Sequence, residues 1–306
     1  MDIIRHKYVF LGISGVLVLA SIAAFALWGL KPGIDFTGGS LLEVEFPGTR
    51  PAPADVIRAL REIGVEHAVV QPISERGMIL RFSHADEETH QQIINTLSVI
   101  GTEPTASGLH PLIAEKRFDT VGPTIGTELK RRAILAVIIA ILAIIAYIAW
   151  AFRAVSRPIA SWKYGIAALV ALVHDVAIPV GAFSALGHFK EIEIDPLFIT
   201  ALLTVLGFSV HDTIVVFDRI RENLHANKSA ESFAATVSRS VSETLARSLM
   251  TSFTVLMVLF VIFFLGGASV RYFALALIIG IAFGTYSSIF VASPILVMWN
   301  TRNKVW

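Results

Sequence analysis

Residues 197–217 read LFITALLTVLGFSVHDTIVVF, a mostly apolar run that contains one acidic residue, Asp212. A helix needs about 20 apolar residues to cross the roughly 30 Å hydrocarbon core of a bilayer, and this run is long enough. A charged side chain near the centre of such a helix costs about 2.5–3.5 kcal/mol on insertion scales, so charged residues there are rare and usually functional. The segment therefore predicts a membrane-spanning helix that carries a functional carboxylate.

Five further apolar runs lie near residues 8–30, 133–152, 164–187, 248–265 and 270–297. Charged residues make up 16% of the chain, against about 25% in a typical soluble domain. The first run exceeds the roughly 7–15 apolar residues of a signal peptide, so we expect it to be retained. The predicted fold is a polytopic α-helical membrane protein with six transmembrane helices: residues 1–30 hold the first, and residues 132–306 form a five-helix bundle.

The basic residues in the short loops predict the orientation of these helices. They precede the first helix, separate the second from the third, fill the 218–247 connection and follow the sixth, whereas the connection 190–195 is net acidic. Both termini and the 218–247 connection are therefore predicted to be cytoplasmic, with residues 31–131 outside. The basic residues used are Arg5, Lys7, Arg153, Arg157, Lys163, Arg219, Arg221, Lys228, Arg239, Arg247, Arg302 and Lys304.

The outer segment 31–131 shows the pattern of a small α+β domain. Its periodicity predicts strands at 41–46, 68–73, 78–82 and within 108–118, and helices at 54–63 and 86–100. Ser83 is the expected N-cap of the second helix. The order βαββαβ is that of a ferredoxin-like fold. The residues leave open whether this domain is a folded spacer or binds a substrate or partner.

Asp212 and Arg247 are the predicted functional pair. Ser209 lies one turn from Asp212 on the same face and is expected to hydrogen-bond to it. Arg247 opens the fifth helix near the same membrane surface, and Arg247, Thr251 and Thr254 form a polar stripe at i, i+4 and i+7. Two alternatives stay open: Asp212 belongs to a static buried ion pair, and Arg247 only extends to the interface.

Asp175 is a second intramembrane acid, in the third helix. Pro179 removes the backbone hydrogen bond that the carbonyl of Asp175 would accept, which predicts a kinked, partly polar site. This site serves as a hinge, as a proton step or only as a structural aspartate. His174 and His211 are able to relay protons, but histidines in helices more often just pack, so neither is assigned a role.

Gly280 and Gly284 form a Gly-x-x-x-Gly pair that predicts close helix packing in the last span. The chain has no cysteine, which excludes disulfides and thiolate metal sites, and it has no Gly-x-x-x-x-Gly-Lys-Ser/Thr loop. We therefore expect no metal, no cofactor and no enzymatic activity. The net charge of +1 argues against nucleic acid as a partner.

Five motifs point to a known family: GIDFTGG at 33–39, HDV at 174–176, DTIVVFDRIREN at 212–223, RSLMTS at 247–252 and GTYSSIFVASP at 284–294. With these motifs the sequence resembles the SecF proteins of the SecD/SecF family of bacterial protein-export membrane proteins. The resemblance covers essentially the whole chain and implies a bundle like half of a transporter of the resistance-nodulation-division superfamily.

The resemblance also implies partners and roles. The chain would act in the bacterial inner membrane, with residues 31–131 periplasmic, beside a SecD-like subunit and the SecYEG channel. It would use the proton motive force to promote translocation of preproteins. The residues matching the family's proton pathway are Asp212, Arg247 and Thr251, and the supporting polar or hinge residues are taken as Asp175, Pro179, Ser209 and Asp35. The competing hypotheses are a proton-driven exporter of small molecules or lipids, and a non-transporting assembly subunit.

Overall fold

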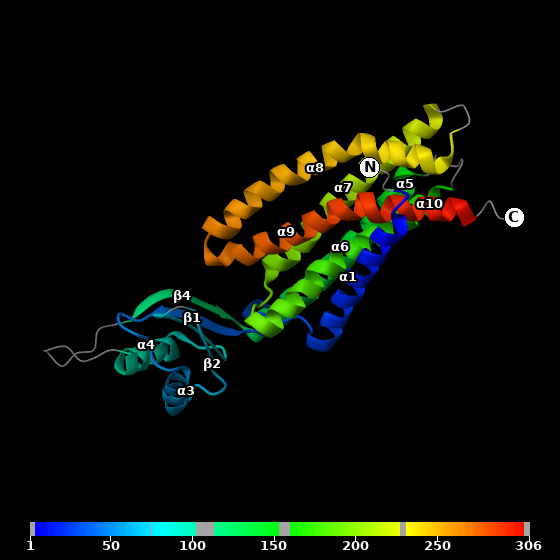
Figure 1. Ribbon diagram of the computed structural model, residues 1–306. Helices are drawn as coiled ribbons and strands as arrows, with labels where there is room; N and C mark the ends of the chain where they lie inside the picture. The colour runs from blue at the N-terminus through cyan, green and yellow to red at the C-terminus, as the bar shows by residue number, and fades with distance from the viewer. Residues whose placement is uncertain (1–3, 74, 102–112, 153–159, 227–230, 303–306) are drawn as a thin grey trace. The chain divides into compact units, whose positions relative to one another are not determined.

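The computed structural model describes residues 4–73, 75–101, 113–152, 160–226 and 231–302, which form two compact units (Figure 1). The membrane unit comprises Met1–Lys31 and Ile134–Trp306, and the α+β unit comprises Pro32–Ala133. The basic residues Arg153, Arg157, Lys228 and Lys304, used above to orient the helices, lie outside the described residues.

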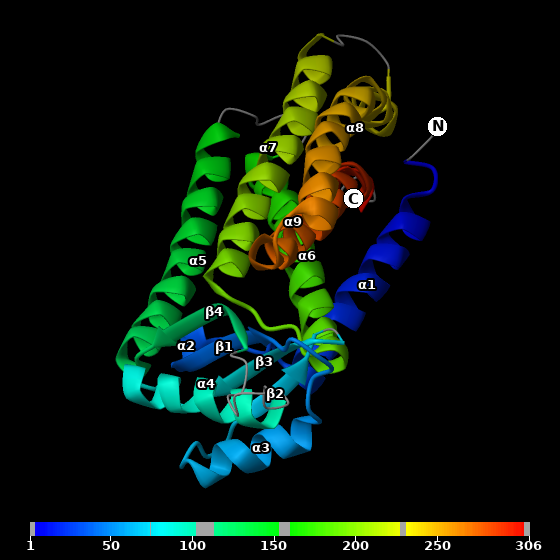
Figure 2. The same cartoon turned by 90° about the vertical axis from the view of Figure 1, so that its left-hand side faces the viewer.

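The α+β unit contains a four-stranded antiparallel sheet in the order β2-β3-β1-β4. Its apolar face is built by strand alternation: Leu42 pairs with Leu80 and Val44 with Met78, and all four side chains are fully buried. Helices α3 and α4 cover this face (Figure 2). The elements are α2 (Ile34–Thr37), β1 (Gly39–Glu45), α3 (Pro53–Glu62), β2 (Val69–Pro72), β3 (Gly77–Phe82), α4 (Glu87–Gly101) and β4 (Ala114–Val121).

The predicted βαββαβ order is confirmed. The last strand was predicted within 108–118. It runs from Ala114 to Val121, and residues 108–112 lie outside the described part of the chain.

Asp86, not the predicted Ser83, caps helix α4. Its Oδ1 accepts a hydrogen bond from the backbone N–H of Thr89 at 3.0 Å, and the helix begins at Glu87. An N-cap side chain satisfies one of the backbone donors that the first turn leaves unpaired. The N–H of Thr89 also holds the pKa of the exposed Asp86 carboxyl below its usual value of 3.8.

This lowered pKa predicts a pH-dependent helix. Because the folded pKa lies below the unfolded one, the stabilisation is present above pH 3.8 and is lost as the pH falls through the folded value. The hydrogen-exchange protection factors of the α4 amides should therefore decrease on acidification. In Asp86→Asn, which keeps an acceptor oxygen that does not titrate, this decrease should be much smaller, and an unaltered acid profile in that variant would refute the assignment.

The turn that leads into β1 depends on two glycines. Gly38 has φ +75° and Gly39 has φ +122°, where a side chain is strained. A Cβ on Gly38 would lie 2.8 Å from the Cα of Pro123, and one on Gly39 would lie 2.8 Å from the carbonyl oxygen of Phe82. The turn therefore packs with its bare backbone against β3 and against the first residue of α5 (Pro123–Ala151).

We predict that Gly38→Ala destabilises the start of β1 by about 1–3 kcal/mol, because it combines backbone strain with a collision. Gly48→Ala is the matched control, since a Cβ there meets nothing within 4 Å. Native-state hydrogen exchange of the β1 amides measures both variants. Equal losses of protection would show that the close approach at Gly38 is unimportant.

The membrane unit has six helices long and apolar enough to cross a bilayer among the described residues, as predicted. α7 ends at residue 226 and α8 begins at residue 233, so most of the predicted 218–247 connection is helical. A prediction based on apolar runs misses these helix ends, because the ends are amphipathic. The helices are α1 (Lys7–Trp28), α5, α6 (Ser161–Lys190), α7 (Pro196–Ala226), α8 (Phe233–Leu265) and α9 (Ala268–Ser287), which continues through a π-helical turn, Ser288–Ala292, into α10 (Ser293–Arg302).

Three of these spans form the centre of the membrane unit. In the most apolar window of each central span, half or more of the residues are buried: 56% in α6, 50% in α7 and 61% in the α9–α10 span. The buried share is only 6% in α1, 6% in α5 and 17% in α8. The acids Asp175 and Asp212 lie on α6 and α7, so both belong to this central layer.

Candidate functional site

The carboxylate of Asp212 links three segments at the centre of the bundle. Asp212 is 8% exposed. The hydroxyl of Ser248 on α8 donates to its Oδ1 at 2.5 Å, and that of Ser288 in the π-helical turn donates to its Oδ2 at 2.5 Å. A buried charge is usually paired with a counter-ion, but among the described residues both hydrogen-bond partners of Asp212 are neutral hydroxyls.

Arg247, the expected functional partner of Asp212, is not bonded to it, because the hydrogen bonds of Asp212 go to Ser248 and Ser288; the sequence had left open whether the two residues touch. Neighbouring residues on a helix point about 100° apart, and α8 turns Ser248 inward, which leaves Arg247 and Thr251 on an exposed face. Within the described part of the chain, the threonines of the predicted stripe bond to the backbone of their own helix and not to another helix. Thr251 donates to the carbonyl of Arg247 at 3.0 Å, and Thr254 donates to the carbonyl of Thr251 at 2.8 Å. The stripe therefore faces away from the interior of this chain.

Asp175 forms a second polar cluster, and the prediction for Ser209 is corrected there. The hydroxyl of Ser209 donates to Asp175 and not to Asp212. Ser287 donates to the same oxygen of Asp175 at 2.7 Å, and Nδ1 of His174 lies 2.8 Å from the other oxygen. Asp175 is 0% exposed, so its carboxylate depends entirely on these partners for solvation.

Small residues let α9 approach both acids. A Cβ on Gly280 would collide with the side chain of Val205, and one on Gly284 would lie 3.2 Å from the Cβ of Ser209. α9 and α7 therefore pack at the distance that bare glycine backbone allows. On α6 the helix continues through Pro179 as one element, without the break that a proline often causes.

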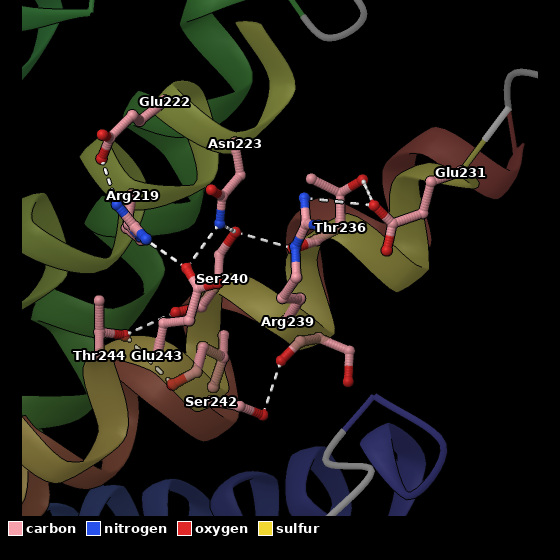
Figure 3. Close-up of polar contacts among 12 residues, drawn as sticks. Arg219, Glu222, Asn223, Glu231, Thr236, Arg239, Ser240, Ser242, Glu243 and Thr244 are labelled. Atoms are coloured by element: carbon pink, nitrogen blue, oxygen red, sulfur yellow. Dashed lines mark hydrogen bonds and ion pairs between the residues drawn. The ribbon is translucent and has the colours of Figure 1, made fainter. Parts of the chain in front are cut away.

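A polar cluster joins the ends of α7 and α8 (Figure 3). The amide of Asn223, which is 8% exposed, donates to Ser240 at 2.9 Å and to Glu243 at 2.8 Å. Arg219 donates to the same Glu243 oxygen at 2.6 Å. We call Arg219, Asn223, Ser240 and Glu243 the α7–α8 clamp. Asn223 follows Asp212 by three helical turns on one face of α7, so the clamp fixes the helix pair that brings Ser248 to Asp212.

Several of these residues were not identified from the sequence. Ser287 and Ser288 were expected only to continue the small-residue packing of Gly280 and Gly284, and Asn223 and Glu243 had no predicted role. Asp35, which was predicted as a supporting residue, is in α2 of the α+β unit, whereas the other candidates belong to the membrane unit.

Residues 103–302 match the family described as protein export membrane protein SecD/SecF, C-terminal, and residues 29–46 match the SecD/SecF GG motif. The chain belongs to the SecD/SecF family. Among its relatives is protein translocase subunit SecF of Thermobaculum terrenum, which is 41% identical over 99% of this chain and 95% of the relative. Protein translocase subunit SecF of Escherichia coli O157:H7 is 35% identical over 99% and 89%.

Solved structures of the SecD/SecF family have the same fold. The crystal structure of SecDF, a translocon-associated membrane protein from Thermus thermophilus, matches 99% of this chain with a TM-score of 0.81 and 32% identity. SecDF in its super-membrane-facing form matches with a TM-score of 0.66 and 32% identity. This chain spans 39% of the length of either SecDF chain. The family's GG motif contains Gly38 and Gly39, whose bare backbone the fold requires.

The α7–α8 clamp gives a testable prediction. Asn223→Leu leaves Glu243 and Ser240 without their shared amide donor, at a cost of about 1–3 kcal/mol, and should loosen the two helix ends. Glu222→Gln is the matched control: Glu222 is an exposed partner of Arg219, and surface ion pairs contribute about 0–1 kcal/mol.

The distance between the end of α7 and the first part of α8 can be measured with two spin labels, one at Ala226→Cys and one at Ser242→Cys. Because the chain has no cysteine of its own, no other site is labelled. Their distance distribution should broaden in Asn223→Leu and stay narrow in Glu222→Gln. A narrow distribution in both would show that the clamp does not hold the helices together.

Proposed function

We propose that this chain is the SecF-type subunit of a bacterial protein-export machine that uses the proton motive force to promote preprotein translocation. It acts with a SecD-like subunit and the SecYEG channel in the inner membrane, and performs no covalent chemistry of its own. The observation that carries the proposal is the carboxylate of Asp212, buried within a membrane helix and bonded to hydroxyls alone among the described residues.

The two hydroxyls make Asp212 suitable as a proton-binding group. An ionised carboxylate only accepts hydrogen bonds, so both serines can donate to it. A protonated carboxyl carries its own O–H donor, so one of its oxygens must find an acceptor instead. Proton uptake therefore changes the bonds that join α7 to α8 and to the π-helical turn. These are the links through which a proton could change the arrangement of the helices.

The energy available sets a lower limit on the number of protons. One elementary charge that crosses 100 mV supplies about 2.3 kcal/mol. Changing a two-state equilibrium from 1:99 to 99:1 needs about 5.5 kcal/mol. A complete conformational switch therefore uses more than one proton or an added pH gradient.

The exposed stripe on α8 supports a SecD-like partner. Arg247, Thr251 and Thr254 lie in or beside the apolar part of α8 and are exposed in this chain alone. An arginine that faces lipid is costly, and a polar partner helix would remove that cost. This chain also corresponds to less than half of the solved SecDF chains, which leaves room for a second bundle against this face. In the proposal Arg247 and Thr251 complete the proton pathway at that contact.

The proposed role of Asp212 can be tested with Asp212→Asn in vesicles that contain this chain, its SecD-like partner and the channel. The variant should assemble and export without a gradient like the wild type, but should lose the gradient-dependent part of export, since an amide cannot take up the proton. Asp218→Asn, which removes an exposed carboxylate on the same helix, is the matched control and should keep it.

Two other results would replace the proposal. Full gradient-dependent export in Asp212→Asn would make the chain an assembly subunit that transports no protons. Gradient-driven movement of lipid or small molecules, with no effect on preproteins, would make it an exporter.

The proposal also predicts the orientation of the chain in the membrane. The proposal places both termini in the cytoplasm and residues 31–131 in the periplasm. Thr49→Cys in the α+β unit should react with a membrane-impermeant maleimide in intact spheroplasts, and Ala226→Cys at the end of α7 only after permeabilisation. Both side chains are exposed, and the natural chain has no cysteine to compete. The reverse pattern of labelling would invert the topology.

A further inference from the structure

The function proposed for Asp212 leaves Asp175 without a role, although it is buried more completely. Its carboxylate has no exposed surface and is held from three helices: by Ser209 of α7, by Ser287 at the end of α9 and by His174 of its own helix α6. A Cβ at Gly284 would lie 3.8 Å from its Oδ2, so α9 meets this carboxylate with a residue that has no side chain. The pocket is thus fitted closely around an acid.

His174 has an unexplained nitrogen. The side chain is 3% exposed, and its Nε2 is buried without a hydrogen-bond partner among the described residues. The ring lies near Phe283 and Tyr286, with centroids 6.2 and 6.0 Å away. Buried polar atoms nearly always have a partner, so an unpaired one calls for a reason. With Nδ1–H donated to Asp175, Nε2 keeps a lone pair that can take up a proton.

Two consecutive serines connect this pair of residues to Asp212. Ser287 donates to Asp175 at 2.7 Å, and Ser288 donates to Asp212 at 2.5 Å. They stand where α9 passes into the π-helical turn, a rare conformation that occurs often at functional sites. α7 provides a second connection, because Ser209, bonded to Asp175, is one turn from Asp212. A change of hydrogen bonding at one acid therefore acts on the backbone that holds the other.

We propose that His174 and Asp175 form a second proton-binding site, coupled to Asp212 through Ser287 and Ser288. The inference rests on the function proposed for Asp212. In the loaded state His174 carries protons on both ring nitrogens and pairs with the Asp175 carboxylate. In the unloaded state Nε2 has lost its proton, and the pair carries one negative charge.

The proton at this site comes from water on one side of the membrane and returns to water on the other. Among the described residues, the titratable side chain in contact with the pair is Tyr286 of α9, whose ring centroid lies 6.0 Å from that of His174, whereas Asp212 is linked to the pair only indirectly, through Ser287 and Ser288. The hydroxyl of Tyr286 donates to the carbonyl of Phe10 at 3.2 Å and accepts from Ser14 at 3.4 Å, both on α1.

The variant His174→Asn separates proton binding from packing, because an asparagine amide can donate to Asp175 in place of Nδ1 but cannot take up a proton. In vesicles with the complete export complex, His174→Asn and Asp175→Asn should keep assembly and gradient-independent export and lose the gradient-dependent part. Ser184→Ala is the matched control: Ser184 is fully buried on the same helix, and its hydroxyl bonds to the carbonyl of Val180. It should keep full coupling.

A second readout does not depend on export. In bilayers that contain the full chain labelled with ¹⁵N-histidine, the resonance missing from His174→Asn identifies His174. Its Nε2 should gain a proton when the bilayer sample is acidified, and this response should differ in Asp212→Asn. A nitrogen that stays unprotonated on acidification would overturn the second site, and an identical response in Asp212→Asn would overturn the coupling.

The two proposals fail in different ways. If Asp212→Asn keeps gradient-dependent export, the function proposed for this chain fails, whatever His174 does. If Asp212→Asn loses that export while His174→Asn keeps it and remains assembled, only the second site fails.

Discussion

The interaction on which the membrane unit depends is the carboxylate of Asp212 held between Ser248 and Ser288. It places an acid inside a bilayer-spanning bundle and ties α7 to α8 and to the π-helical turn at one point. Because its described partners are neutral, the charge on this group is not cancelled locally. In the proposed function, a change in its protonation rearranges the hydrogen bonds that join these segments.

The surrounding structure keeps those segments close enough to respond. Gly280 and Gly284 bring α9 against α7, and the α7–α8 clamp holds the other pair of helices together beyond the apolar region. The buried Asp175 lies against the same two elements, α7 and α9, through Ser209 and Ser287. In the proposal each of these two acids belongs to a separate proton-binding site, which suits a cycle that uses more than one proton.

The sequence predicted the features that local pattern controls. Six apolar runs predicted the six spans, and strand and helix periodicity predicted the βαββαβ unit. Asp212 was predicted as a functional residue because it is an acid within an apolar run. The prediction failed where one residue of rotation decides contact: α8 presents Ser248 to Asp212 and turns Arg247 outward. The π-helical turn that lets Ser287 and Ser288 reach two different acids has no sequence signature. The polar ends of α7 and α8 carry no apolar run, so residues 218–247 were predicted only as a connection between two helices.

The most direct test counts protons. Vesicles that contain this chain, its SecD-like partner and the channel can be given a known proton gradient, and proton entry can be measured together with preprotein export. With a membrane potential of about 100 mV and no pH difference, we predict that more than one proton enters for each conformational cycle and that coupled entry stops in Asp212→Asn. Gradient-stimulated export without proton entry, or with one proton or fewer per cycle under these conditions, would contradict this prediction.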